Sequence, residues 1–294
     1  MTKKKQYQPD TVMKDFFRDT DRFIDIVNGF LFQGLPIVDD AIELDSEQAT
    51  TTRNKSVQSR RDLIKIVSID GKAVIIGIEN QQTRDKNMIY RDMEYTSLKY
   101  NIRLKDKRNE ICPIITLVIY CGKYKWNYET ELIQMMKIPH KIDKYINNWK
   151  TIVIDAKKVN ISLLKNKDVR DFFEGIQKIY QWKNDNNNIL DKDFTYETAF
   201  TIGVVTGTEV LIDKAKRKAG GTINMKNAIN DALKEREISG EIRGRDKGKV
   251  EAKLEAIRKV MEKLHLDEEK AMDFFEIPLN ERYIYISALQ QHNS

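Results

Sequence analysis

Apolar residues near the start of the chain recur at helical spacing. Phe16, Phe23 and Val27 follow one another at steps of seven and four, and Gly34-Leu35-Pro36 then interrupts the pattern. Such steps place side chains on one face of a helix, whereas glycine and proline end helices. The pattern predicts one or two amphipathic helices within residues 10–32.

The next apolar segment has the composition of strands. Residues 62–69 and 72–79 are two runs rich in β-branched side chains, and Asp70-Gly71 separates them. An Asp-Gly pair between two such runs is a strong signal for a tight turn. This segment therefore predicts a β-hairpin.

Later patterns alternate between helix and strand. A helical pattern over 86–101 precedes the run 113–120, which is too uniformly apolar for an edge strand and predicts a strand buried on both faces. A short strand is predicted at 151–154, and helices dominate from 168 onward. Strands interleaved with helices make the predicted fold class α/β.

The C-terminal segment combines glycine with charge. Gly240, Gly244 and Gly248 stand four residues apart among charged side chains, which favours a flexible connector before a charged helix, and two short helical patterns flank Pro278. Glycines at this spacing pack helices closely in membranes, but the charged neighbours argue against that setting. We therefore expect three segments: a core over 1–160, a helical part packed on it over 161–238, and a charged helix with a small helical appendage over 239–294.

Charge and cysteine content narrow the function classes. The chain has 51 Lys and Arg against 45 Asp and Glu, a net charge of +6 and a pI near 9.0, which favours a polyanionic partner without requiring one. Two cysteines and three scattered histidines give neither a disulfide framework nor a zinc motif. The sequence shows no apolar signal core and no uninterrupted apolar stretch of membrane-spanning length, so we expect a cytoplasmic protein without a membrane partner.

Three polar residues mark the ends of the predicted hairpin. Asp62 opens its first strand, and Glu79 and Gln81 close the second. Residues two apart on a strand share a face, and the turn brings Asp62 across from them, so two carboxylates converge. Adjacent carboxylates repel unless a cation lies between them, and their oxygens suit a hard divalent ion. Mg²⁺ or Mn²⁺ bound here would activate water for phosphodiester hydrolysis.

This chemistry has one weak point and one alternative. Gln81 stands where a lysine would position the attacking water, and its amide can hydrogen-bond water or phosphate but carries no charge. Arg61 and Lys65 are the candidates to supply the missing charge. Taken alone, Asp62 and Glu79 also fit an interpretation as ordinary strand-end residues.

Several motifs follow one another in order over residues 10–235. They are Arg60-Arg61-Asp62-Leu63-Ile64, Ile76-Gly77-Ile78-Glu79-Asn80-Gln81, Arg91 and Tyr95 on a helix, the strand 113–120 followed by Gly122 and Trp126, and Ile202-Gly203-Val204-Val205-Thr206-Gly207. The ordered set resembles the Rpn family of recombination-promoting nucleases and transposases, within the PD-(D/E)XK nuclease class. The Glu-x-Gln motif at residues 79–81 departs from the lysine of that class but matches this family.

The resemblance implies a fold, a metal site and an activity. The fold is a restriction-endonuclease-like αβββαβ core whose first helix offers an acidic residue to the metal site; Asp10 is our choice and Asp15 the alternative. Asp10, Asp62 and Glu79 would hold Mg²⁺ or Mn²⁺, and Gln81 would position water or phosphate. The implied activity is metal-dependent DNA endonuclease cleavage, with recombination or transposition as the consequence.

The expected partner is DNA. We expect Arg61, Lys65 and Arg91 to contact it, because basic side chains bind the phosphate backbone. Two other functions stay open: a nuclease-like fold that binds DNA without cleaving it, and a scaffold that assembles through the helices after residue 240. Double-strand cleavage would favour a homodimer, which the sequence neither requires nor excludes.

Overall fold

The computed structural model describes residues 7–44, 47–52, 55–60, 63–105, 111–185, 189–217 and 220–290. The chain divides into two compact units, Met1–Ile229 and Asn230–Ser294. The three-part division expected from the sequence differs from this one and stays a prediction. Its boundary at 160 lies within the first unit.

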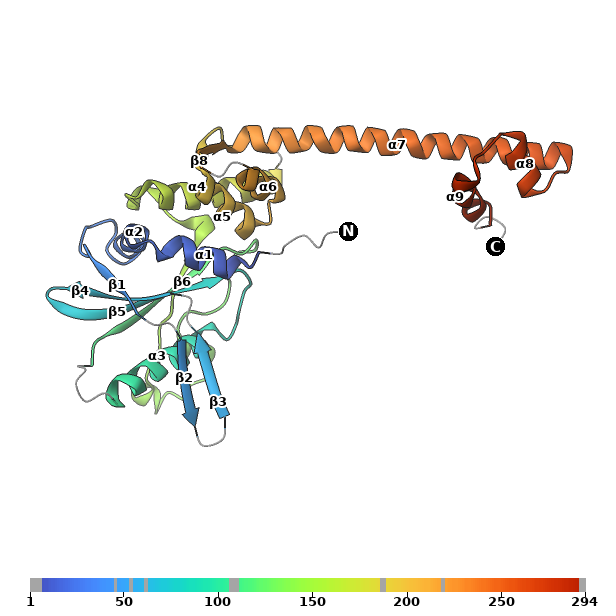
Figure 1. The fold of residues 1–294 in the computed structure, drawn as a ribbon. Helices are drawn as coiled ribbons and strands as arrows, with labels where there is room; N and C mark the ends of the chain where they lie inside the picture. The colour runs from blue at the N-terminus through green and yellow to red at the C-terminus, as the bar shows by residue number, and fades with distance from the viewer. Residues whose placement is uncertain are drawn as a thin grey trace. The chain divides into compact units, whose positions relative to one another are not determined.

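A five-stranded mixed sheet forms the centre of the first unit (Figure 1). In spatial order its strands are β1 (Ala41–Glu43), β4 (Leu63–Ile69), β5 (Lys72–Gln81), β6 (Ile114–Tyr120) and β7 (Ile152–Asp155). β1, β4 and β5 are antiparallel neighbours, whereas β6 and β7 run parallel to β5. β6 lies between two strands and its last five residues are buried, as its apolar sequence predicts. The α/β class and the short strand β7 are confirmed.

The β4–β5 hairpin turns over two residues. Asp70 and Gly71, which lie directly between the two strands, both have positive φ, of 52° and 71°. Positive φ at both central positions gives the type I′ turn, whose twist matches that of the strands; glycine adopts it freely and Asp tolerates it. The predicted hairpin is confirmed, and its described pairing runs as far as Leu63 opposite Ile78.

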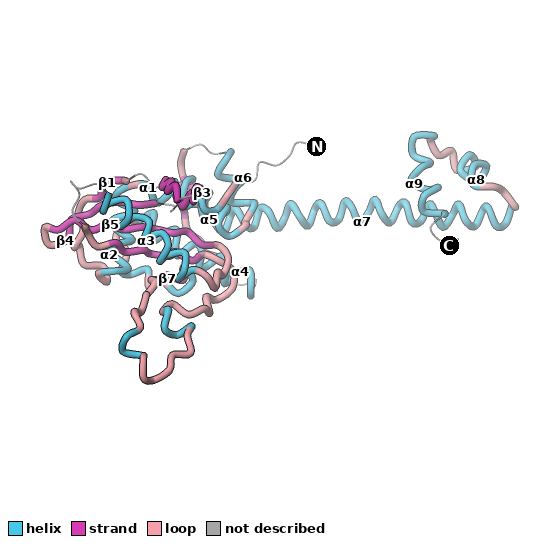
Figure 2. The backbone as a smooth tube through the Cα atoms, turned by 90° about the horizontal axis from the view of Figure 1, so that it is seen from below, coloured by secondary structure: helices cyan, strands magenta, loops and turns pink. Residues whose placement is uncertain are grey.

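Helices cover both faces of the sheet (Figures 1 and 2). α1 (Pro9–Arg18), α2 (Thr20–Leu31) and α4 (Lys167–Asp185) lie on one face, and α3 (Met88–Lys105) lies on the other. The first apolar pattern thus forms two helices, which is one of the two predicted arrangements. The helix predicted before the buried strand is present as α3.

The main core lies between the sheet and α1, α2 and α4. Ile76 and Ile78 of β5 are fully buried in it with Phe17 and Phe172, whose rings meet edge to face at 5.2 Å between centroids. Burying a side chain of this size contributes about 1.5–3 kcal/mol. Residues of the opposite parity, such as Ile75, belong to a smaller cluster on the other face. Odd-numbered and even-numbered positions of β5 therefore see different environments.

Shorter elements complete the first unit. β2 (Glu47–Thr52) and β3 (Lys55–Arg60) form a hairpin that follows β1 in the sequence, and β8 (Asp193–Thr195) pairs with β9 (Thr222–Asn224). The remaining elements described here are α5 (Tyr196–Thr206), α6 (Glu209–Arg217) and the 3-10 turns η1 (Leu132–Met135), η2 (Asp143–Tyr145), η3 (Ala156–Lys158) and η4 (Ile161–Leu163).

The helix α7 (Met225–Leu264) runs without a break through the three glycines expected to form a flexible connector, so that expectation is wrong. An interior glycine costs about 1 kcal/mol relative to alanine. Strong helix formers surround these glycines, and pairs at i,i+4 such as Lys247–Glu251 add to helix stability. Local helix propensity therefore outweighs the glycines.

Two short helices, α8 (Glu268–Phe274) and α9 (Leu279–Gln290), complete the second unit. They confirm the two C-terminal helices predicted from the sequence. Ile257 of α7, Met272 of α8 and Tyr285 of α9 share one small buried cluster. Among the described residues, no helix is both long and apolar enough to cross a membrane.

Candidate active site

β5 carries a buried carboxylate at its C-terminal end. Glu79 lies opposite Val118 of β6 and is 3% exposed, and Gln81 is 9% exposed. Because side chains alternate along a strand, Glu79 and Gln81 share one face, which is the face that α3 covers. A buried carboxylate is stable only with an opposite charge or hydrogen bonds. The residues around Glu79 therefore decide what this end of the sheet can bind.

Arg91, in the first turn of α3, is the charge partner of Glu79. Its Nη2 donates to Glu79 Oε1, and its Nη1 donates to Asp85 Oδ2 at 3.1 Å and to Gln81 Oε1 at 3.4 Å. Gln81 also donates through Nε2 to the carbonyl oxygen of Thr83 at 3.0 Å. One guanidinium thus contacts both ends of the Glu-x-Gln motif and the segment that precedes α3.

Tyr95 holds the same guanidinium one helical turn further on. Its hydroxyl accepts from Arg91 Nη2 at 3.2 Å and from Nε at 3.4 Å. Burial by itself lowers the pKa of Arg91, but the hydrogen bond to Tyr95 and the charge of Glu79 outweigh it, so that the pKa lies above its ordinary value. Arg91 is therefore a permanent cation at this end of the sheet.

Asp10, in the first turn of α1, is influenced by the positive charge of Arg91. Partial burial raises its pKa, and the positive charge of Arg91 opposes that rise. The alternative acidic residue of the first helix, Asp15, pairs with Arg18 at 3.5 Å, and both Asp10 and Asp15 are exposed to solvent. The charge of Arg91 therefore acts on Asp10.

Two predicted site residues, Arg61 and Asp62, lie outside the described residues. The predicted approach of Asp62 to Glu79 stays a prediction. Within the described ranges, no group of three or more His, Cys, Asp or Glu side chains is arranged to hold a metal ion. A complete ligand set would therefore have to draw on groups beyond those side chains.

Lys65 requires a correction. Its side chain is 1% exposed, and its Nζ donates to the carbonyl oxygen of Arg18 at 2.7 Å and to Thr20 Oγ1 at 3.1 Å. Lys65 lies opposite Ile76, so it points to the α1–α2 face and away from the face of Glu79. Burial lowers its pKa. The prediction that Lys65 contacts DNA or supplies the charge missing at Gln81 is wrong, because this ammonium is buried on the other side of the sheet.

Asp85 and Tyr95 are site residues that the sequence analysis did not identify as such. Tyr95 follows Arg91 by four residues, a spacing that places two side chains together on a helix, so the sequence carried a signal for this pair. The contact of Asp85 depends on how the turn before α3 folds back on β5. No spacing rule gives that contact.

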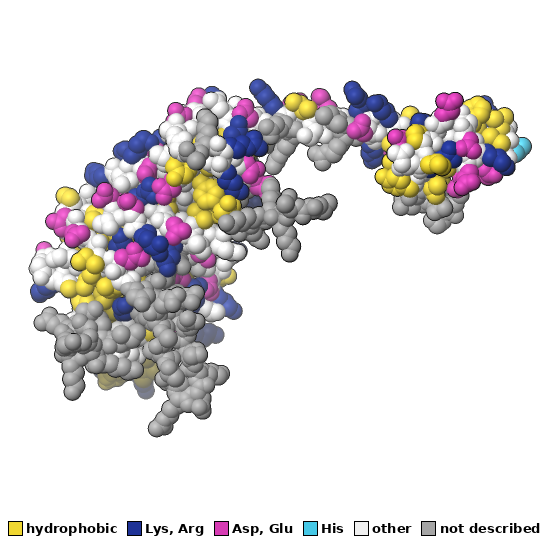
Figure 3. All heavy atoms as spheres, in the orientation of Figure 1, with side chains coloured by type: hydrophobic (Ala, Val, Ile, Leu, Met, Phe, Trp, Pro, Cys, Tyr) yellow, Lys and Arg dark blue, Asp and Glu magenta, His cyan; other side chains and the backbone are white. Residues whose placement is uncertain are grey.

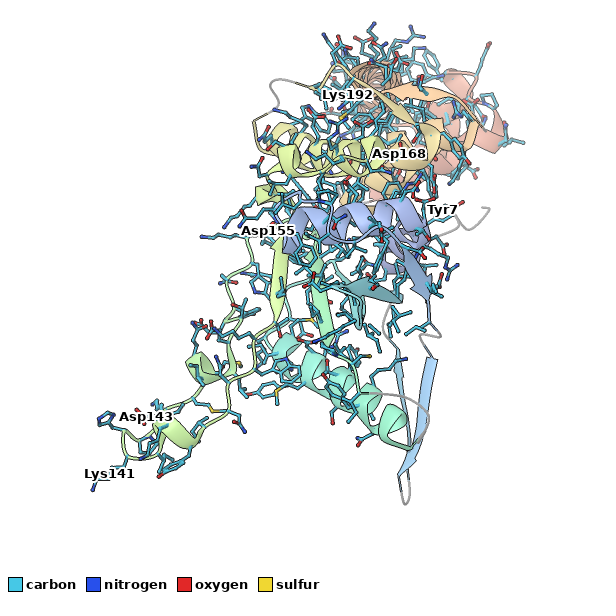
Figure 4. All side chains as sticks on the ribbon, turned by 90° about the vertical axis from the view of Figure 1, so that its left-hand side faces the viewer. Tyr7, Lys141, Asp143, Asp155, Asp168 and Lys192 are labelled. Atoms are coloured by element: carbon cyan, nitrogen blue, oxygen red, sulfur yellow. The ribbon has the colours of Figure 1, made fainter. Side chains whose placement is uncertain are left out.

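Exposed cations lie next to the site. Arg84 is exposed, donates from Nη1 to Asn127 Oδ1 at 2.8 Å and has its guanidinium 5.5 Å from the ring of Tyr124. Tyr124 lies near the start of the long β6–β7 loop, residues 121–151. This loop carries six exposed lysines against three acidic residues. Figure 4 shows Lys141 and Asp143 at the tip of this loop.

The face of the molecule drawn in Figure 3 carries both charges. Figure 3 shows Lys and Arg side chains interspersed with Asp and Glu over the visible face. The net positive charge of the chain is therefore spread out there, in contrast with the lysine excess of the β6–β7 loop. A mixed surface of this kind gives no single polyanion-binding patch by itself.

Comparison with known proteins gives one result. The model of one protein family, described as putative transposase, YhgA-like, matches residues 8–199, which is more than half of the chain. The matched segment holds the whole five-stranded sheet and every residue from Asp10 to Tyr95 discussed above. No curated protein and no solved structure gives a significant match.

Proposed function

The chain belongs to the family of YhgA-like putative transposases, and on that premise we propose that it is a metal-dependent DNA endonuclease. The family assignment supports a role associated with transposition. The observation that carries the proposal is the buried carboxylate of Glu79 beside Gln81 and Arg91 at the end of a central strand. Buried, charge-coupled acidic groups at a strand end are typical of catalytic sites.

The order of elements supports a PD-(D/E)XK core. Helices α1 and α2 precede three antiparallel strands, β1, β4 and β5, and α3 then leads to β6, which is parallel to β5. This is the αβββαβ order expected from the sequence. We take the β2–β3 hairpin as an insertion between the first two of these strands.

The donor set fits a hard divalent ion. Glu79 and Asp10 offer carboxylate oxygens, and Asp62 directly precedes Leu63, whose strand partner Ile78 directly precedes Glu79. Carboxylates are the ligands that Mg²⁺ and Mn²⁺ prefer. We propose that these three carboxylates hold the metal. When bound, such an ion supplies a water of lowered pKa and offsets charge on the leaving oxygen.

The other side chains would orient the reactants. Gln81 is restrained by Arg91 and by the Thr83 carbonyl, so its amide has a defined direction for water or a phosphate oxygen. Gln81 carries no charge, and Arg91 places a cation 3.4 Å from its Oε1. Arg91 therefore takes the electrostatic role that the sequence analysis assigned to Arg61 or Lys65. Arg84 and the lysines of the β6–β7 loop would hold the DNA backbone.

A second function is a nuclease-like protein that binds DNA without cleaving it. The contact that favours it is the Arg91–Glu79 pair, because Arg91 already neutralises the carboxylate without a metal. Such a site could keep its fold after losing its chemistry. The two functions differ in what Mg²⁺ does to DNA in the presence of the protein.

Nicking of supercoiled plasmid separates these functions. The full chain is incubated with DNA and Mg²⁺, Mn²⁺ or EDTA, beside the Asp62→Asn, Glu79→Gln and Asp15→Asn proteins. We expect metal-dependent nicking by the wild type and by Asp15→Asn, the matched control for loss of one carboxylate, and none by the other two. Absence of nicking, or equal nicking by all four proteins, would favour the DNA-binding function.

A further inference from the structure

We propose that Arg91 is a built-in counter-ion that competes with the divalent metal for Glu79, so that a DNA phosphate bound to Arg91 strengthens binding of the metal. In this arrangement DNA phosphate draws Arg91 away from Glu79 and frees the carboxylate for the metal. The inference rests on the proposed function, because it assigns a regulation to the same site. Arg91 regulates the site in this proposal, and the metal ligands remain Asp10, Asp62 and Glu79.

Arg91 and a metal cannot both use Glu79 in the same way. Arg91 Nη2 donates a hydrogen bond to Glu79 Oε1, a carboxylate oxygen of the kind that would ligate the ion. A guanidinium and a divalent cation on one carboxylate repel each other, and the repulsion is strong where burial excludes water. Glu79 is 3% exposed. Binding of the metal at full strength therefore requires Arg91 to leave Oε1.

The Arg91 guanidinium has hydrogen-bond acceptors other than Glu79. Its side chain is 35% exposed, and it already donates to Asp85 Oδ2 at 3.1 Å and to the Tyr95 hydroxyl at 3.2 Å. Asp85 is itself partly exposed and lies in the segment before α3. When Nη2 leaves Glu79, the guanidinium still has a carboxylate and a hydroxyl as acceptors. The charge of Arg91 therefore stays paired on both sides of the exchange.

Arg22 shows what a fixed arginine looks like in the same fold. Its side chain is 11% exposed and donates to Asp168 at 2.8 Å and to Glu197 at 2.7 Å, while its guanidinium lies 4.2 Å from the centre of the Phe16 ring. Its partners belong to three helices, α1, α4 and α5. Arg91 differs in that part of its side chain faces solvent at the end of the sheet.

A DNA phosphate is the ligand that would hold Arg91 in its second position. Guanidinium groups bind phosphate through two parallel hydrogen bonds, and the partly exposed side chain of Arg91 is accessible to a phosphate from solvent. Because binding free energies are linked, a phosphate that strengthens metal binding is itself bound more tightly when the metal is present. The metal would thus bind most tightly when DNA is present.

Metal affinity tests the competition directly. Isothermal titration of the full chain with Mn²⁺ compares the wild type with Arg91→Gln, Arg91→Lys and Arg84→Gln, the last being the control for loss of a nearby cation that does not touch Glu79. We expect Arg91→Gln to bind Mn²⁺ at least about tenfold more tightly, which is the ratio for one modest ion pair. Arg91→Lys should return towards the wild-type affinity, and Arg84→Gln should stay within about twofold.

The outcomes separate this inference from the proposed function. If the wild type binds Mn²⁺ and nicks plasmid, but Arg91→Gln binds Mn²⁺ equally or more weakly, the competition is wrong and the nuclease stands. If neither the wild type nor Arg91→Gln binds Mn²⁺ and no nicking occurs, both are overturned.

A measurement on the unaltered protein avoids any folding defect of the variants. The ¹⁵N signal of the Arg91 Nε–H group, identified by its loss in Arg91→Lys, is followed as Mg²⁺ is added, and the Arg22 signal serves as the internal reference. We expect the Arg91 signal to move and the Arg22 signal to stay. An Arg91 signal that does not move at saturating Mg²⁺ would overturn the exchange.

Discussion

The β4–β5 hairpin buries one charged residue on each of its faces, and the two are held in different ways. Lys65 of β4 bonds the backbone carbonyl of Arg18, at the end of α1, and the hydroxyl of Thr20 at the start of α2. Glu79 of β5 bonds the side chain of Arg91, which is partly exposed. Both charges are almost fully removed from solvent.

The difference shows that burial of a charge does not by itself mark a functional residue. The carbonyl of Arg18 lies at the C-terminal end of α1, where a cation also interacts favourably with the helix dipole, and Thr20 begins α2. Neither partner can leave without disrupting the junction between these helices. The partner of Glu79 is a long side chain with other acceptors within reach. A buried charge can take part in binding or catalysis when its partner can be exchanged.

The largest effect is expected at Glu79. Glu79→Gln keeps the shape of the side chain but removes its charge, so nicking should fall by on the order of a thousandfold, as for loss of a principal catalytic group. The melting temperature should change little, since the amide can still accept from Arg91. Initial nicking rates and a thermal scan of the same samples measure both. If Glu79→Gln lost much of its stability but nicked DNA normally, Glu79 would be a structural residue like Lys65.

Lys65 should show the reverse behaviour. Lys65→Ala leaves a cavity and two buried acceptors without their donor, which costs about 2–4 kcal/mol of unfolding free energy. Lys65→Met keeps most of the volume and should cost about 1–2 kcal/mol. Urea unfolding gives these values, and nicking per folded molecule should equal that of the wild type. A nicking defect in folded Lys65→Met would show that Lys65 affects the active site across the sheet and would contradict its purely structural role.

Asp10 sharpens the comparison because it lies on the helix whose end Lys65 contacts, yet senses Arg91. Asp10→Asn should lower nicking by about tenfold, or about 1.4 kcal/mol, the effect of losing one exposed metal ligand while Asp62 and Glu79 remain. Asp15→Asn removes a carboxylate from the same helix and should leave nicking unchanged. Equal defects in the two variants would point to α1 as a whole and would exclude a specific role of Asp10.

The smallest effect is expected for the exposed lysines of the β6–β7 loop. Replacing Lys141 and Lys144 by alanine should weaken DNA binding a few-fold and reduce the salt dependence by about two units of slope, one for each lost phosphate contact. Fluorescence anisotropy at several salt concentrations measures both quantities. Mn²⁺ affinity without DNA should not change. An unchanged salt slope would show that this loop does not contact the DNA backbone.

The sequence predicted the hairpin and the shared face of Glu79 and Gln81, because alternation and the Asp-Gly turn are local properties. It also contained the signal that excludes Lys65, since a two-residue turn places residues 65 and 76 opposite each other and residue 79 on the other face. The Arg91–Glu79 contact depends on how α3 packs against the sheet, which no local pattern gives. The continuous helix α7 differs from the expected flexible connector because the helix propensity of the charged residues around the three glycines exceeds the cost of those glycines.

The two-residue turn also limits how this protein can change in length during evolution. One residue inserted between the turn and Glu79 would rotate that carboxylate into the main core, and two would carry it about 7 Å past Arg91. The β6–β7 loop has no such constraint, because its length does not alter the register of β5. Descendants of this sequence should therefore gain and lose residues in that loop, while the stretch from Leu63 to Gln81 keeps its length.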